Sequence, residues 1–362
     1  MKRVHNFCLK MRVLLLGTLL ASTLWGCAHT PGEMRIGPVT DAQGQFIVWP
    51  PVPEVPRYMY VGDLIGENNF HHPGETASRS ASGFWNWLVG TADDVTPLGL
   101  QRPQSGTVDE EGRIYVTDSS RQGVYVFDNV RGELLLWNVA EPQVKFSSPA
   151  GIVLDEAGGA WVADAELGLV AHLNKDGAPL ASIGKGQLKR PTGLARDPVN
   201  KWLYVADTNA HDVKVFDEAG RLIKTIGSHG EGEGKFNHPT HLAFSHGNLY
   251  VTDTMNNRIQ IFDAEGRLLR KFGERGLFVG NLVRPKGIGV DDEGNIYVVE
   301  SYYDHLLVFS KNGTLLLAIG GTGKEAGHFY LPAGVWVDRF NRVFVADMFN
   351  GRVAVFQFLG GS

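Results

Sequence analysis

The chain has 362 residues, of which 20 % are charged and 10 % aromatic, and it holds 45 glycines. This composition is typical of a globular, turn-rich protein and excludes a disordered or collagen-like chain. The formal charge is −5 at pH 7, which disfavours nucleic-acid binding. The two cysteines lie in no CxxC spacing, so thiolate zinc sites and covalently attached haem are excluded.

The first 26 residues have the pattern of an export signal. Basic residues precede the apolar run Val13 to Trp25, whose 13 residues are short for a bilayer span of about 20. The run ends in Leu24-Trp25-Gly26-Cys27, which resembles the lipobox of bacterial lipoproteins, although Trp25 is bulkier than the residue usual there. The resemblance implies acylation of Cys27 and, because Ala28 follows, sorting to the outer membrane on the side of the periplasm. An ordinary signal peptide with a chance cysteine is the alternative.

Removal of residues 1–26 would take away four positive and no negative charges, so the formal charge would move from −5 to −9. Residues 27–54 contain Pro50, Pro51 and Pro53, and we expect them to form a proline-rich tether between the lipid and the folded domain.

A short module recurs six times along the rest of the chain. Each copy holds a proline, a turn, a tetrad of the form aromatic-Val-x-acidic, and a further alternating apolar stretch. The acidic residues of successive tetrads are 46, 43, 46, 47 and 47 residues apart. The tetrads are Tyr115–Asp118, Trp161–Asp164, Tyr204–Asp207, Tyr250–Asp253, Tyr297–Glu300 and Phe344–Asp347.

Each copy contains short stretches with the two-residue alternation of β-strands, separated by turn residues. Four antiparallel strands in a period of about 45 residues are typical of a propeller blade. We therefore predict an all-β fold over residues 55–358, a six-bladed β-propeller of four-stranded antiparallel blades. The sixth copy lacks its outer strand, whereas a matching stretch, Arg57–Gly62, precedes the first copy. We expect this N-terminal outer strand to complete the last blade and close the ring, which hides strand edges.

The same residues resemble the NHL repeat. The resemblance rests on a Pro-x-Gly start, the aromatic-Val-x-Asp tetrad, and Asp-x-x-Asn-x-Arg before the third strand. Asp253–Arg258 and Asp347–Arg352 are the complete copies of the last motif, and the other four copies lack the Asn/Arg pair. The resemblance implies the propeller fold and carries little information about function.

One insertion breaks the repeat. In three copies 12 residues separate the outer-strand glycine from the next proline, but 41 separate Gly62 from Pro103, an excess of 29. The insertion, at about 66–95, contains the aromatic and apolar residues Phe84, Trp85, Trp87 and Leu88. Two interpretations stay open, namely a flap over one end of the propeller and an exposed patch for a partner or a lipid surface.

Candidate binding residues lie where the innermost strands begin, at the mouth of the central channel. The position two after the proline is small in five copies and is His241 in the fourth. The candidates for this channel face are Gln104, Ser105, Thr192, Thr240, His241 and Lys286. The acidic residues of the tetrads fit turns that a carboxylate closes by accepting backbone hydrogen bonds, rather than a ring of metal ligands.

Two classes of function remain. Some six-bladed propellers that resemble this chain are enzymes, such as peptide-amidating lyases with a three-histidine zinc site and lactonases with a carboxylate-bound metal. This chain places only His241, a weak metal candidate, on an innermost strand, and it has no hydrolase or phosphate-loop motif. We therefore expect a monomeric, lipid-anchored scaffold without catalytic residues or cofactor, which binds an unidentified protein or peptide. The alternative is a metal-dependent lyase or hydrolase with Zn or Ca in the channel.

Overall fold

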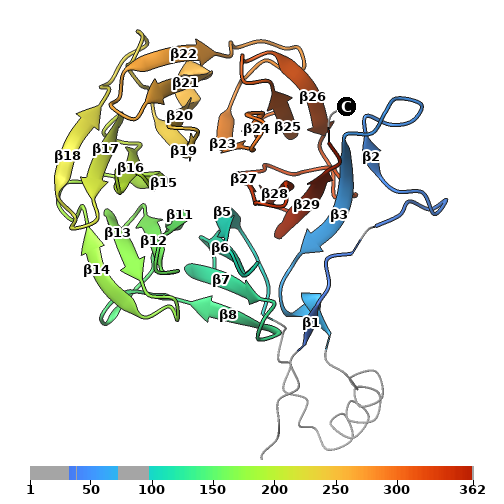
Figure 1. The fold of residues 1–362 in the computed structure, drawn as a ribbon, viewed down its shortest axis with the longest axis horizontal. Coiled ribbons are helices and arrows are strands. Elements are labelled where there is room, and N and C mark those ends of the chain that lie inside the picture. Colours follow the sequence, from blue (N-terminus) through green and yellow to red (C-terminus); the bar gives the residue numbers. More distant parts are fainter. Residues whose placement is uncertain (1–31, 38, 72–97, 361–362) are drawn as a thin grey trace, which may run out of the picture.

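The computed structural model describes residues 32–37, 39–71 and 98–360. Six antiparallel sheets stand around a central axis (Figure 1), and each contains four strands or, in one case, five. The prediction of a six-bladed β-propeller is confirmed. Cys27 and the aromatic and apolar residues of the insertion, Phe84, Trp85, Trp87 and Leu88, lie outside the described residues. In the described ranges no helix has the length and apolar character that crossing a membrane requires.

Within blades one to five, the chain passes from the innermost strand to the outermost. The first three blades are β5 (Pro103–Val108), β6 (Ile114–Asp118), β7 (Gly123–Asp128) and β8 (Glu133–Trp137), then β11 (Pro149–Leu154), β12 (Ala160–Asp164), β13 (Leu169–Leu173) and β14 (Pro179–Ile183), then β15 (Pro191–Asp197), β16 (Trp202–Asp207), β17 (Asp212–Asp217) and β18 (Leu222–Ile226). The fourth and fifth blades are β19 (Pro239–Ser245), β20 (Asn248–Asp253), β21 (Arg258–Asp263) and β22 (Leu268–Phe272), then β23 (Pro285–Val290), β24 (Ile296–Glu300), β25 (His305–Phe309) and β26 (Leu315–Gly320).

The sixth blade takes strands from both ends of the chain. Its members in order are β27 (Val335–Val337), β28 (Arg342–Asp347), β29 (Arg352–Phe358), β3 (Tyr58–Leu64) and β2 (Val48–Trp49). The N-terminal strand β3 pairs antiparallel with β29, so it closes the ring as the sequence predicts (Figure 1). The fifth strand, β2, adds a short outer pairing that the four-stranded pattern does not include. The remaining short elements are β1 (Glu33–Met34), η2 (Glu67–Asn69), β4 (Phe70–His71), β9 (Val139–Glu141), β10 (Val144–Lys145) and η3 (Thr254–Asn256).

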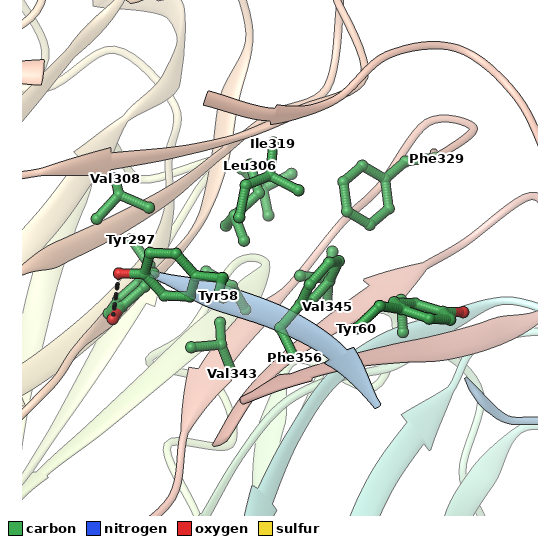
Figure 2. Packing of buried hydrophobic residues seen from close by; sticks show 13 residues of the cluster. Tyr58, Tyr60, Tyr297, Leu306, Val308, Ile319, Phe329, Val343, Val345 and Phe356 are labelled. Carbon is green, nitrogen blue, oxygen red and sulfur yellow. Dashed lines mark hydrogen bonds between the residues drawn. The ribbon is translucent and has the colours of Figure 1, made fainter. Parts of the chain in front are cut away.

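Aromatic residues pack the seam where β3 enters the sixth blade (Figure 2). Side chains alternate along a strand, and on β3 this alternation buries Tyr58 and Tyr60, which are 3 % and 1 % exposed. The hydroxyl of Tyr58 lies 3.0 Å from the hydroxyl of Tyr297 on the fifth blade. The ring of Tyr60 meets Phe356 edge-on, with 5.4 Å between centroids. The closing strand β3 therefore contributes side chains to the hydrophobic core as well as backbone hydrogen bonds.

The described part of the segment 27–54 lies against the propeller. The N–H of Gly32 donates a hydrogen bond of 3.1 Å to the carbonyl of Gly132, in the turn between β7 and β8. Trp49 packs edge-on against Phe356, with 5.5 Å between ring centroids. The apolar side chains of this segment explain the contact, because burying them removes apolar surface from water.

Candidate functional site

All innermost strands begin at one face of the ring, which we call the channel-mouth face. The register places the proline that begins an innermost strand opposite the carboxylate that ends the second strand, as in Pro103 opposite Asp118 and Pro239 opposite Asp253. The loop that enters each blade and the turn after each tetrad therefore meet at this face. This face is where the sequence places the candidate binding residues.

The tetrad carboxylates are buried and hold the loops of the channel-mouth face. Asp118 accepts hydrogen bonds from the backbone N–H groups of Gln101 and Arg102 in the entering loop, at 2.7 and 2.9 Å. It also accepts from the N–H groups of Ser120 and Arg121 in the following turn, both at 3.0 Å. Similar contacts recur in the second, third and fifth blades. This is the turn-closing role that the sequence predicts for these residues. The hydrogen bonds fix the backbone of the loops and turns on the channel-mouth face.

The Asn/Arg pairs of the fourth and sixth blades brace the entering loop further. The Nε of Arg258 donates to Asp253 at 2.8 Å, and its Nη2 donates to the carbonyls of Gly232 and Lys235 at 2.7 and 2.9 Å. Arg352 makes the equivalent contacts in the sixth blade. A buried arginine thus lies under each of these two loops and fixes its tip.

The channel is narrowest at the channel-mouth face, because neighbouring innermost strands touch there. A Cβ atom on Gly193 would lie 2.6 Å from the carbonyl oxygen of Thr240, and one on Gly334 would lie 2.4 Å from that of Gln104. Only glycine permits this approach. Toward the opposite face the channel widens into a cavity of about 270 Å³, whose lining includes Ser105 and His241.

Two of the predicted binding residues join blades through their hydroxyls. Thr240 Oγ1 lies 2.7 Å from Thr254 Oγ1, which donates to the carbonyl of Pro285 on the next blade at 2.9 Å. Thr192 makes the same kind of pair with Thr208 one blade earlier, at 2.7 Å. These hydroxyls are engaged within the chain, so their main effect is to fix the relative position of neighbouring blades.

His241 and Lys286 lie on adjacent innermost strands. His241 Nδ1 is 3.0 Å from Thr240 Oγ1, and burial together with the positive charge of Lys286 lowers the pKa of His241 to about 3. Burial and the nearby charge of Arg284 also lower the pKa of Lys286. An ammonium beside the imidazole repels a metal ion, so the pair does not favour the metal-dependent alternative. Within the described ranges, no group of three or more His, Cys, Asp or Glu side chains is placed to hold a metal ion.

Gln104 lies on the first blade, across the channel from His241. Its Nε2 donates to Ser119 Oγ at 3.1 Å and lies 3.2 Å from Met348 Sδ. The structure therefore groups Thr192, Thr240, His241 and Lys286 on the third to fifth blades and places Gln104 apart from them, whereas Ser105 lines the channel cavity together with His241.

Arginine and aromatic side chains that are not among the predicted binding residues surround the channel mouth. The guanidinium of Arg102 lies 5.3 Å from the ring centre of Phe349, and that of Arg284 lies 6.0 Å from the ring centre of Tyr302. Phe349 also meets Tyr330 edge-on at 5.6 Å. Tyr302, Tyr330 and Phe349 expose 55 %, 45 % and 47 % of their surface. The sequence places Tyr302 in the turn after its tetrad, and a comparison of the turns would also have found Phe349, because both stand second after the tetrad, where the first three copies have polar residues.

Positively charged side chains accompany these aromatic residues. Arg190 on the third blade forms a salt bridge with Glu166 at 2.6 Å. For Arg102, Arg284 and Lys286, no carboxylate of a described residue lies within the 4.0 Å of a salt bridge. The channel-mouth face can therefore offer cationic groups and aromatic rings to an anionic partner.

The ring of six sheets, its central channel and its closing strand define a six-bladed β-propeller. A family model described as a 6-bladed beta-propeller matches residues 197–266 and 281–362, so the chain is similar to that family over the later blades and less than half of its length. No curated protein matches the chain.

Many solved structures share this fold. Virginiamycin B lyase from Staphylococcus aureus is 14 % identical with a TM-score of 0.53, and the match covers 72 % of this chain and 98 % of the lyase. An auxiliary nutrient binding protein from Bacteroides thetaiotaomicron VPI-5482 is 14 % identical with a TM-score of 0.58, covering 72 % and 70 %. A chain of a nidogen/laminin complex is 18 % identical with a TM-score of 0.52, covering 67 % and 84 %. At these identities the likeness concerns the fold alone.

Proposed function

We propose that the protein is a lipid-anchored, non-catalytic scaffold of the bacterial cell envelope, of the NHL-repeat type, that binds a protein or peptide on its channel-mouth face. The arginine–aromatic pairs Arg102–Phe349 and Arg284–Tyr302 carry this proposal. Arginine and tyrosine dominate the energetics of many protein interfaces. Holding these side chains in place before a partner arrives reduces the entropy lost on binding.

The fixed backbone of the loops that carry Arg102 and Arg284 supports the same conclusion. Arg102 and Arg284 belong to entering loops whose backbone N–H groups are bound by Asp118 and Glu300. Function in a repeat fold usually resides on such loops, because the rigid sheets hold them while their side chains vary. One of the structural neighbours is an auxiliary nutrient binding protein, which is consistent with binding as the task of such a fold.

The proposed anchor orients the scaffold. Gly32 lies five positions after Cys27, and this length of chain spans at most about 18 Å. Gly32 is bound to Gly132 in the turn between β7 and β8, which lies on the face opposite the channel mouth. A lipid on Cys27 would hold that opposite face near the outer membrane and turn the channel mouth toward the periplasm. In this proposal the protein acts as a monomer, and residues Phe84, Trp85, Trp87 and Leu88 of the insertion supply a second contact surface.

Site-specific photo-crosslinking in the native cells tests the docking face. We expect a photo-reactive amino acid at Phe349 to give a discrete crosslinked product, and we expect Arg102→Ser with Arg284→Ser to remove it. Phe340 is a matched control, because it is 53 % exposed and Arg339 lies 4.8 Å from its ring centre, yet it occupies the opposite face. Products of equal yield at Phe340 and Phe349, or none at Phe349, would refute docking on the channel-mouth face.

A further inference from the structure

The loop that enters the fifth blade has an exposed apolar tip, which consists of Leu277, Phe278 and Val279. Leu277, Phe278 and Val279 expose 87 %, 82 % and 64 % of their surface. At the same register after a glycine, the loop of the fourth blade has Glu231-Gly232-Glu233 and the loop of the sixth has Lys324-Glu325-Ala326. The apolar tip therefore belongs to the fifth blade and is not a general feature of the repeat. Three neighbouring exposed apolar side chains indicate a contact surface.

A small recess lies under this tip. Leu277, Phe278 and Val279 line it together with Tyr303 and Leu307, among others, and its volume is about 90 Å³. The arginine that braces the loops of the fourth and sixth blades is replaced in the fifth by His305. Without that guanidinium the space under the loop stays open, with room for one aliphatic side chain.

The inner end of the same blade is cationic. Arg284 and Lys286 lie two residues apart where β23 begins, and no carboxylate of a described residue forms a salt bridge with either. Two neighbouring cations without an acid are unfavourable in a partly buried place, and an anionic group would relieve their repulsion. Tyr302 lies beside Arg284, and its ring is 5.0 Å from that of Tyr303 at the recess. The fifth blade thus presents one continuous strip that is cationic at the channel mouth and apolar at the rim.

We infer that this strip of the fifth blade binds an extended acidic segment of a protein partner, with a carboxylate against Arg284 and Lys286 and an aliphatic side chain in the recess beneath Leu277–Val279. The inference rests on the proposed function and names the chemistry of its partner. Charge complementarity selects the acidic segment. The lipid surface is not the occupant, because the proposed anchor holds the opposite face toward the membrane.

A random 12-residue peptide phage library, selected on the full-length chain in mild detergent, tests the inference. We expect enriched peptides to combine acidic residues with Leu, Ile, Val or Phe a few positions away. Arg284→Ser with Lys286→Ser should weaken a selected peptide about tenfold or more, and the affinity should fall as salt rises. Phe278→Ser, at an exposed position that folding does not need, should weaken it about fivefold or more.

Matched controls come from the other blades. Lys189→Ser with Lys324→Ser also removes two positive charges from the channel-mouth face, but on other blades. This variant should change the affinity less than about twofold. Enrichment of peptides without acidic residues, no enrichment at all, or affinities indifferent to the fifth-blade variants would each overturn the inference. If Phe349 still crosslinks a partner in cells while the fifth-blade variants have no effect, the docking face stands and only this strip is wrong.

Discussion

At the channel mouth a single imidazole occupies a position that is glycine in four of the other five blades. The glycines are required because neighbouring innermost strands approach too closely for a Cβ atom. His241 instead fills the end of the channel cavity and is bound to Thr240. Its surroundings hold it neutral, so its ring contributes shape and one hydrogen bond rather than charge.

The lowered pKa of His241 predicts a pH-dependent loss of stability. The imidazole titrates near 6.5 in the unfolded chain and near 3 in the folded protein, so between these values the unfolded state binds more protons. His241 therefore lowers the free energy of unfolding as the pH falls from 6.5 toward 3, by at most about 1.4 kcal/mol per pH unit, and has no such effect above 6.5. We expect His241→Gln to remove this contribution to the pH dependence. The free energy of unfolding is measured by urea denaturation at several pH values between 7 and 4.5. His71→Gln, at an exposed position, should leave the pH dependence of the unfolding free energy unchanged. The same pH dependence in His241→Gln and the wild type would contradict the prediction.

Single residues show how far the sequence predicts the site. His241 was identifiable because it departs from glycine at a repeated position, and the tetrad carboxylates because their spacing fits turns. The pair Arg102–Phe349 was not identifiable, because its members come from the first and last blades and meet only when the ring closes. Thr192 and Thr240 lie at the face where the sequence places them, but the bond from Thr192 to the carbonyl of Thr240 on the next blade and the pair Thr240–Thr254 depend on distances that the sequence does not contain.

Among the strands, β3 has the largest effect on the architecture. It was predictable because the last copy lacks an outer strand and a matching stretch precedes the first copy. The two-residue strand β2 was not, since so short a pairing leaves no alternation to recognise. Besides its backbone bonds, β3 brings Tyr60, whose hydroxyl donates to Asp63, while Asp63 pairs with Arg352 on β29 at 3.0 Å.

Truncation of Tyr60 should therefore weaken the closure of the ring. Its ring is buried against Phe356, so Tyr60→Ala should lower the free energy of unfolding by about 3–5 kcal/mol, measured by urea denaturation. Tyr60→Phe keeps the ring and loses the bond to Asp63, so it should cost only about 1–2 kcal/mol. Equal losses for the two variants would show that the hydroxyl, and not the packed ring, holds β3 in place.

For the molecule as a whole, both the closure of the ring and the proposed orientation on the membrane depend on the N-terminal region. The same segment that supplies β3 begins next to the turn between β7 and β8, opposite the channel mouth. The exposed aromatic rings, the cations Arg102, Arg284 and Lys286, and the apolar tip all lie on the channel-mouth face. This separation of a proposed anchor from a proposed docking face gives the scaffold a defined direction relative to the membrane.

The anchor itself yields the last prediction. Each buried CH₂ of a lipid chain contributes about 0.8 kcal/mol, so an anchor of two or more chains holds a protein firmly on a bilayer. The wild-type chain should remain in the membrane pellet after washing at high salt and should be released by detergent, whereas Cys27→Ser should move to the soluble fraction. Cys8→Ser is the matched control, because Cys8 lies in the proposed export signal and would leave with it, so this variant should behave as the wild type. If Cys27→Ser stays in the pellet, another part of the chain binds the membrane. The argument that the opposite face lies toward the membrane would then fail, although the channel-mouth face could still be the docking face.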